Sequence, residues 1–135
     1  MSIKETIEGI VAGSAAINRM RQEIEIVVGT VVSLVPDSDL RAWRKAIGGE
    51  QMTAYKAGQL KAEFRSLSCK WTFSYYSNVE LFFGEHLVYS SLSNKLTMRN
   101  VQRVHEALPT FVELMIRTFP GLSEQLRPLL DAAEK

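Results

Sequence analysis

A repeat of apolar residues at the start of the chain constrains the fold more than any other feature. One row of the repeat has a member every seven residues and consists of Ile3, Ile10, Ile17, Ile24 and Val31. A second row, four residues after each member of the first, consists of Ile7, Ser14, Arg21, Val28 and Val35. Mainly apolar positions spaced alternately by four and three residues are typical of a helix that packs against another helix along its whole length. The spacing therefore predicts one long helix over residues 2–35.

The length of this helix predicts a partner. At about 1.5 Å per residue it would measure roughly 50 Å. A compact domain of 135 residues has a radius of gyration of about 14 Å and a diameter below about 40 Å. The helix would therefore project from its own domain, and we expect it to pack against a second copy in a homo-oligomer, most simply a two-fold dimer. The predicted interface consists of Ile3, Ile7, Ile10, Ile17, Arg21 and Ile24.

Two points on this helix leave alternatives open. Residues 24–35 are rich in β-branched side chains and could instead form a hairpin about Gly29–Thr30, although the unbroken heptad favours a helix. Arg21 places a charge on the apolar seam and needs a partner, either within the helical hairpin or from Glu23 or Glu25 of another copy.

The rest of the chain predicts an α+β fold. A second helix and a short helix or loop complete a helical hairpin with one long arm, residues 2–57. From Gln59 the apolar period changes to two, which predicts an antiparallel meander of three to four strands over residues 59–92. Helices return over residues 97–134 and are expected to cover one face of the sheet. We expect residues 1–135 to form a single domain.

Composition narrows the classes of function. With 46% hydrophobic and 23% charged residues the chain is typical of a soluble globular protein. Its 16 basic and 15 acidic side chains give a net charge of +1, which disfavours nucleic-acid binding. The lone Cys69 excludes an intramolecular disulfide and favours the cytoplasm. The chain shows no apparent secretory signal, and its richest apolar stretch is too short to span a bilayer.

The sequence contains no motif for catalysis. The two histidines, His86 and His105, have no neighbours that would form a nucleophile–base–orienter set. We find no metal-ligand spacing and no glycine-rich phosphate loop, so we predict neither a metal nor a cofactor. An enzyme is the least favoured class.

Aromatic and basic residues suggest one candidate ligand site. Trp71, Phe73 and Tyr75 alternate along a strand and are expected in the sheet core, whereas Tyr76 would lie outside it and could stack on a ring. A basic side chain nearby could hold an anion, although a solvated helix face is the other interpretation of these cations. The candidate ligand-binding residues are Trp43, Arg44, Tyr76, Arg99 and Arg103.

These patterns leave two functions to weigh. The first is a non-catalytic, self-associating interaction protein, for example a small bacterial or phage accessory protein that binds or sequesters a protein partner. The alternative is a protein that binds an anionic, nucleotide-like small molecule in a pocket between the helices and the aromatic sheet. The self-association seam favours the first.

Overall fold

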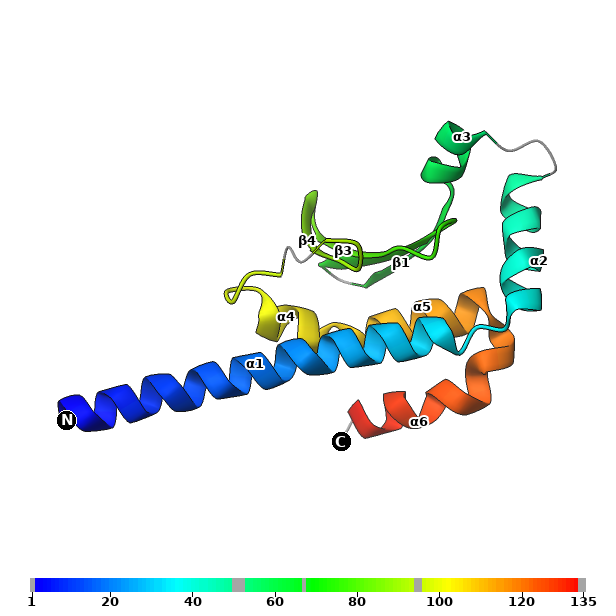
Figure 1. Ribbon diagram of the computed structural model, residues 1–135. Helices are drawn as coiled ribbons and strands as arrows, with labels where there is room; N and C mark the ends of the chain where they lie inside the picture. The colour runs from blue at the N-terminus through cyan, green and yellow to red at the C-terminus, as the bar shows by residue number, and fades with distance from the viewer. Residues whose placement is uncertain (1, 50–52, 67, 94–95, 134–135) are drawn as a thin grey trace.

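The computed structural model of the chain describes residues 2–49, 53–66, 68–93 and 96–133, and it has the predicted α+β architecture (Figure 1). Helices come first, an antiparallel sheet follows, and further helices end the chain. The elements are α1 (Ile3–Ser33), α2 (Asp37–Gly48), α3 (Ala54–Gln59), β1 (Lys61–Ser66), β2 (Cys69–Ser74), β3 (Val79–Phe83), β4 (His86–Ser90), α4 (Val101–Glu106), α5 (Leu108–Thr118), the 3-10 turn η1 (Pro120–Leu122) and α6 (Ser123–Ala133).

The long first helix is confirmed. A capping box starts it, because the Glu5 amide donates to Ser2 Oγ at 3.1 Å and the Ser2 amide donates to a Glu5 carboxylate oxygen at 3.4 Å. Helical hydrogen bonding continues through the β-branched segment to Ser33, so the alternative of a hairpin about Gly29–Thr30 is wrong. The apolar rows of α1 pack on the rest of the domain here, and that tertiary packing outweighs the β propensity.

The helices that follow α1 differ in detail from the prediction. α2 stands at a steep angle to α1 and does not return along it (Figure 1), so the two helices form a corner. A short helix or loop is predicted after the second helix. Residues 50–52 of that segment lie outside the described residues. α3 continues to Gln59, where the change to a period of two predicts the start of the sheet.

The sheet is a four-stranded antiparallel meander in the order β1-β2-β3-β4. Its register places Phe64, Trp71, Leu81 and Tyr89 side by side across all four strands. An irregularity between Leu81 and Phe82 interrupts the β3–β4 pairing. Because side chains alternate along each strand, this row and the parallel row through Phe73 face the helices together.

The C-terminal helices cover one face of the sheet, as predicted (Figure 1). α5 lies against β1 and β2, α1 runs beside α5 and shares a cavity with β4, and α6 packs against α5 on the side away from the sheet. The helical region breaks at Ala107, and Pro109 occupies the first turn of α5. α4 begins at Val101 with Asn100 as its N-cap, whereas the predicted helical region starts at residue 97.

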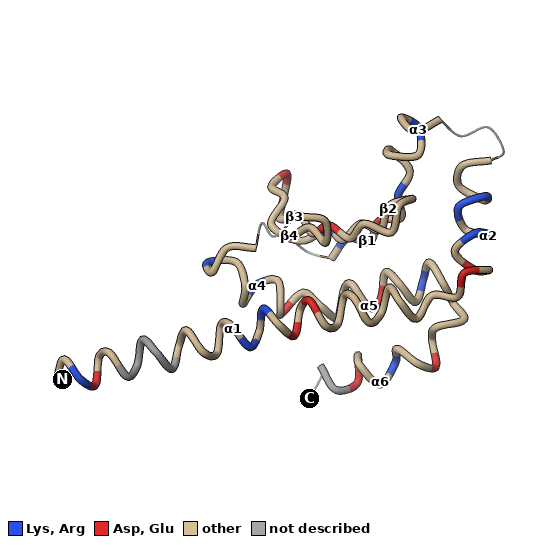
Figure 2. The backbone as a smooth tube through the Cα atoms, viewed as in Figure 1, with Lys and Arg blue, Asp and Glu red and all other residues tan. Residues whose placement is uncertain are grey.

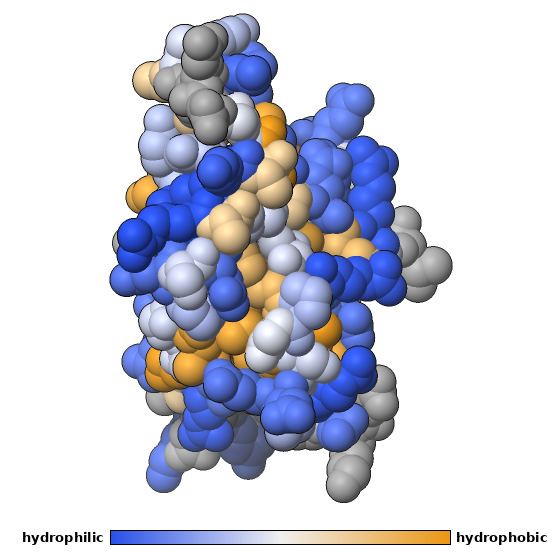
Figure 3. Space-filling view, turned by 90° about the vertical axis from the view of Figure 1, so that its right-hand side faces the viewer, coloured by the Kyte–Doolittle hydropathy of each residue, from blue (hydrophilic) through white to orange (hydrophobic). Residues whose placement is uncertain are grey.

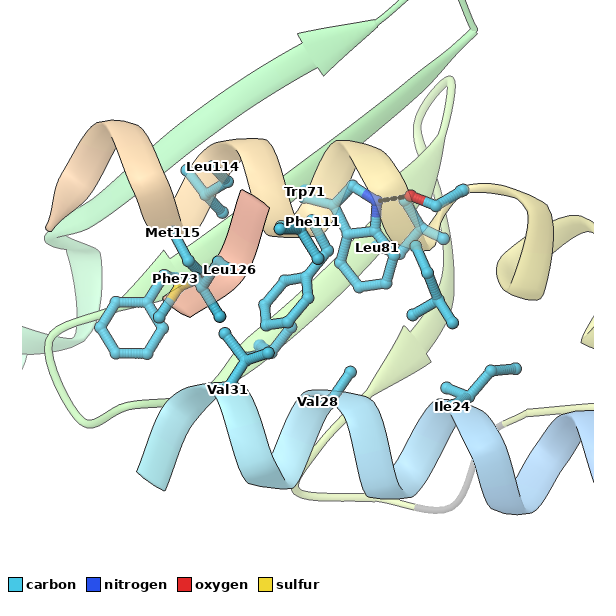
Figure 4. Close-up of a cluster of buried hydrophobic side chains, with 14 of the residues drawn as sticks. Ile24, Val28, Val31, Trp71, Phe73, Leu81, Phe111, Leu114, Met115 and Leu126 are labelled. Atoms are coloured by element: carbon cyan, nitrogen blue, oxygen red, sulfur yellow. Dashed lines mark hydrogen bonds between the residues drawn. The ribbon is translucent and has the colours of Figure 1, made fainter. Parts of the chain in front are cut away.

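Trp71 lies at the centre of the core (Figure 4). Its side chain is fully buried, and its indole Nε1 donates to the carbonyl oxygen of Ala107 at 2.9 Å. Phe111 packs against the indole with 5.2 Å between ring centroids. From the opposite side, α1 contributes Ile24 and Val28. One side chain of the sheet thus contacts the point where α4 ends and α5 begins.

We expect Trp71→Phe to lower the free energy of unfolding by about 2–4 kcal/mol, because it leaves a cavity and removes the buried hydrogen bond from the indole to the Ala107 carbonyl oxygen. Urea unfolding monitored by circular dichroism measures the change. Tyr55→Ala is the control, since Tyr55 is 79% exposed and its loss should change stability by less than about 0.5 kcal/mol. Equal effects of the two substitutions would contradict the central role of Trp71.

Candidate functional site

The N-terminal part of α1 extends beyond the rest of the molecule (Figure 1). We call residues 3–16 the arm. Among the described side chains of α1, those packed against the core begin with Ile17 and Met20. Within the arm, Ile3 is 81% exposed and Ile7 is 53% exposed. The arm therefore presents large apolar side chains that its own domain does not cover.

The composition of the arm is unusual for a helix in water. Residues 9–18 include no charged side chain, and Figure 2 shows charged residues at the tip of α1 and again where it reaches the body of the domain. Solvent-exposed helices normally carry charges on the face turned away from the core. Gly13 is exposed, and a Cβ added there would meet nothing within 4 Å, so packing within this chain does not require the glycine.

The predicted interface residues fall into different environments. Ile3 and Ile7 are exposed on the arm, and Ile17 is partly buried at its base. The side chain of Ile10 lies outside the described residues. Ile24 is 0% exposed, which corrects its placement in an interface between copies: it packs in the core of its own chain. The heptad repeat therefore runs from the arm, where Ile3 and Ile7 are exposed, into the part of α1 that packs on the core of its own chain.

Arg21 sits at the boundary between these two parts of α1. One terminal guanidinium nitrogen donates weakly to the carbonyl oxygen of Leu96 at 3.4 Å, while Nε is buried without a hydrogen-bond partner in the described structure. Glu23, one of the partners expected from another copy, instead contacts His105 of its own chain, with 2.6 Å between Oε2 and Nε2. Arg21 is thus poorly satisfied within the chain.

We expect Arg21→Leu to leave the free energy of unfolding unchanged or to raise it by about 1 kcal/mol, because it removes a buried donor that has no partner. Thermal and urea unfolding test this directly. A loss of several kilocalories per mole would show that the contact with Leu96 stabilises the fold. Arg19→Leu, on the exposed side of the same helix, provides the comparison.

Trp43 and Tyr76, two of the predicted ligand residues, lie near the α2 corner. Trp43 packs on the core, with its ring centroid 5.2 Å from that of Phe73 and 5.7 Å from that of Phe119. Tyr76 is 58% exposed. A cavity of about 510 Å³ lies beside Trp43 and Phe119, and the molecule seen from the α2 side has apolar residues near the middle of that face (Figure 3).

Arg44 fastens α2 to the turn between β2 and β3. Its Nε donates to the carbonyl oxygen of Tyr75 at 2.7 Å, and a terminal nitrogen donates to Ser77 Oγ at 3.3 Å. The guanidinium also lies 5.3 Å from the ring centroid of Tyr75. Ser77 has φ 63°, a conformation that costs energy in a non-glycine residue. The contacts of Arg44 therefore indicate a structural role.

Arg99 and Arg103 are far from this corner. They belong to the segment that leads into α4 and to α4 itself, at the end of the domain opposite α2 (Figure 1). Arg103 lies over the ring of Phe83, with 4.0 Å from the guanidinium carbon to the ring centroid. Of the three arginines considered as the cation beside Trp43 and Tyr76, only Arg44 therefore lies at the same end of the domain as these aromatics. Their sequence positions carried no information on which end of the sheet each would meet.

We expect Arg44→Gln to lower the free energy of unfolding by about 1–2 kcal/mol, because it removes a charge-assisted hydrogen bond that supports a strained turn. Tyr76→Ala should change it by less than about 0.5 kcal/mol, since the ring is mostly exposed. Both are measured by urea unfolding. Should Tyr76→Ala cost as much as Arg44→Gln, Tyr76 would have to be counted among the packing residues.

Two side chains among the described residues have raised pKa values. Burial raises the pKa of the Cys69 thiol despite hydrogen bonds with Thr110 and Ser66, so the reactive thiolate is disfavoured. Burial, with a smaller contribution from the charge of Glu25, raises the pKa of Tyr89 to about 12. Within the described ranges, no group of three or more His, Cys, Asp or Glu residues could hold a metal ion, and no helix is long and apolar enough to cross a membrane.

Comparison of the chain with protein-family models, with curated proteins and with solved structures finds no match. The function must therefore be argued from the geometry.

Proposed function

We propose that this chain is a non-catalytic interaction protein that self-associates through its N-terminal arm as a two-fold dimer. The proposal rests on one observation: the arm exposes the apolar side chains of Ile3 and Ile7 on a helix that extends beyond its own domain. A cytoplasmic location fits the single thiol, which cannot form an internal disulfide. Binding or sequestering a further protein partner, as a bacterial or phage accessory protein would, is the broader role in which we place the dimer.

Helix energetics support a partner for the arm. Gly9 and Gly13 each cost about 1 kcal/mol relative to alanine inside a helix. Full burial of one isoleucine side chain stabilises by about 1.5–3 kcal/mol, so covering Ile3 and Ile7 would offset the cost of the two glycines.

The arm suits pairing with its own copy. A two-fold interface must be complementary to itself, and the uncharged residues 9–18 bring no like charges together. In an antiparallel pair centred on Gly9 and Gly13, the helices can approach closely where they cross. The two domains then lie at opposite ends of the pair, where they do not obstruct each other (Figure 1).

The test is Ile7→Asp, which places a charge in the apolar row. We expect the wild-type protein to sediment with twice the 15.2 kDa mass of one chain at tens of micromolar. Ile7→Asp should sediment as a monomer and keep its near-ultraviolet circular dichroism. Sedimentation velocity over a concentration series measures both.

The matched control is Ala16→Asp. This residue is also exposed on the arm, but at 3.6 residues per turn it lies on the side of the helix away from the Ile3–Ile7 row. It should leave the dimer intact. A monomeric wild type at these concentrations, or equal dissociation by the two aspartates, would overturn the proposal. Ile17 is less suitable for this test because it also packs on its own core.

A further inference from the structure

A cavity of about 470 Å³ lies at the end of the sheet opposite α2, beside the start of α4. Three separate parts of the chain line it: the β1–β2 turn, the β3–β4 hairpin and the segment that enters α4. Most of its polar lining consists of hydrogen-bond donors or groups that can donate. The lining residues used below are Ser68, Phe83, Val88, Asn100 and Arg103.

Arg103 is held in place while its donors stay free. Its guanidinium stacks on Phe83 at 4.0 Å, which fixes the plane of the group. Among the described residues, the Arg103 side chain makes no hydrogen bond or ion pair. The Arg44 guanidinium, by contrast, donates hydrogen bonds to the carbonyl oxygen of Tyr75 and to Ser77 Oγ. A guanidinium that is oriented and unpaired beside a cavity is suited to bind an oxyanion.

The surroundings of the cavity are positively charged. A neighbouring cavity of about 310 Å³ shares Ser68 and is lined by Arg65 and Lys70. Lys70 pairs loosely with Glu63 at 3.9 Å, while Arg65 has no ion pair in the described structure. Glu85 occupies the β3–β4 turn and is exposed, but it is not among the lining residues. Neighbouring cations raise the local concentration of anions.

Two further features of the cavity restrict the chemical class of the ligand that it can bind. Arg103 covers one face of Phe83, the aromatic residue that lines the cavity, so a nucleobase cannot stack on that face without displacing the guanidinium. The cavity is larger than a phosphate ion requires, and Val88 supplies an apolar wall. We propose that this cavity binds a small phosphate monoester, with the phosphate held by Arg103, Asn100 and Ser68 and the organic group beside Val88.

The experiment titrates the full-length protein with phenyl phosphate and with inorganic phosphate by isothermal titration calorimetry, at pH 7.5 and low ionic strength. We expect saturable binding of both, with phenyl phosphate at least as tight. Phenol, which lacks the anion, should not bind. Arg103→Gln should lower the binding affinity for both anions about tenfold to a hundredfold, because it removes a charge-assisted hydrogen bond.

Two variants serve as controls, and a third tests another residue of the proposed site. Arg117→Gln removes a comparable stacked arginine, 4.4 Å over Phe64, and Arg99→Gln removes an exposed charge nearby; neither residue lines the cavity, so both should bind as the wild type does. Ser68→Ala, at an exposed turn, should weaken binding severalfold without altering the melting temperature.

Three outcomes would overturn the proposal. The first is the absence of saturable binding at millimolar phosphate. The second is equal weakening by the Arg103, Arg117 and Arg99 variants, which would show a diffuse effect of charge. The third is tighter binding of inorganic phosphate than of its phenyl ester, which would show that the cavity excludes the organic group. None of these results depends on whether the protein is a dimer.

Discussion

The hydrogen bond from Trp71 to Ala107 is the contact on which the arrangement of the two layers depends. Ala107 lies where α4 ends and α5 begins, and its carbonyl oxygen accepts from the Thr110 amide of α5 at 3.0 Å. The indole donates a further hydrogen bond to the same oxygen from the centre of the sheet, at 2.9 Å. This bond and the packing of Phe111 on the indole hold the junction of α4 and α5 on the strands, and α1 packs Ile24 and Val28 into the same core. Everything in α1 before Ile17 is left beyond the edge of the domain.

The sequence predicted the elements well and the partners of the first helix only in part. Alternation in β1 to β4 and the heptad in α1 are local periodicities, and both are visible in one chain. The same heptad, however, covers Ile24, which is buried in its own core, and Ile3, which is exposed. An apolar row that packs on its own domain and one that packs on another copy need the same spacing. The two cases differ only in whether the row lies inside or outside the edge of the domain, and contacts between residues far apart in the sequence determine where that edge is.

The candidate site was less predictable for a related reason. In the sequence, Arg44 and Arg103 are both basic residues on predicted helices. Their spacing could not show that Arg44 donates hydrogen bonds to the β2–β3 turn, whereas Arg103 stacks on Phe83 and keeps its donors free. The cavity beside Arg103 also draws on Ser68 and Asn100. These residues meet only because antiparallel strands bring alternate turns to one end of the sheet. Proximity of this kind depends on register, which no local pattern reveals.

The division of α1 into two parts also determines how assembly relates to folding. Residues from Ile17 onward are helical within the domain, so the arm extends an existing helix and avoids the cost of nucleation. The core residues, Ile24 among them, are buried within a single copy, so the domain does not need a partner to complete its core. In obligate dimers, by contrast, the folded monomer is not stable and stability depends on protomer concentration. The proposed self-association should therefore stabilise the arm alone, and a monomeric variant should keep the domain around Trp71 folded.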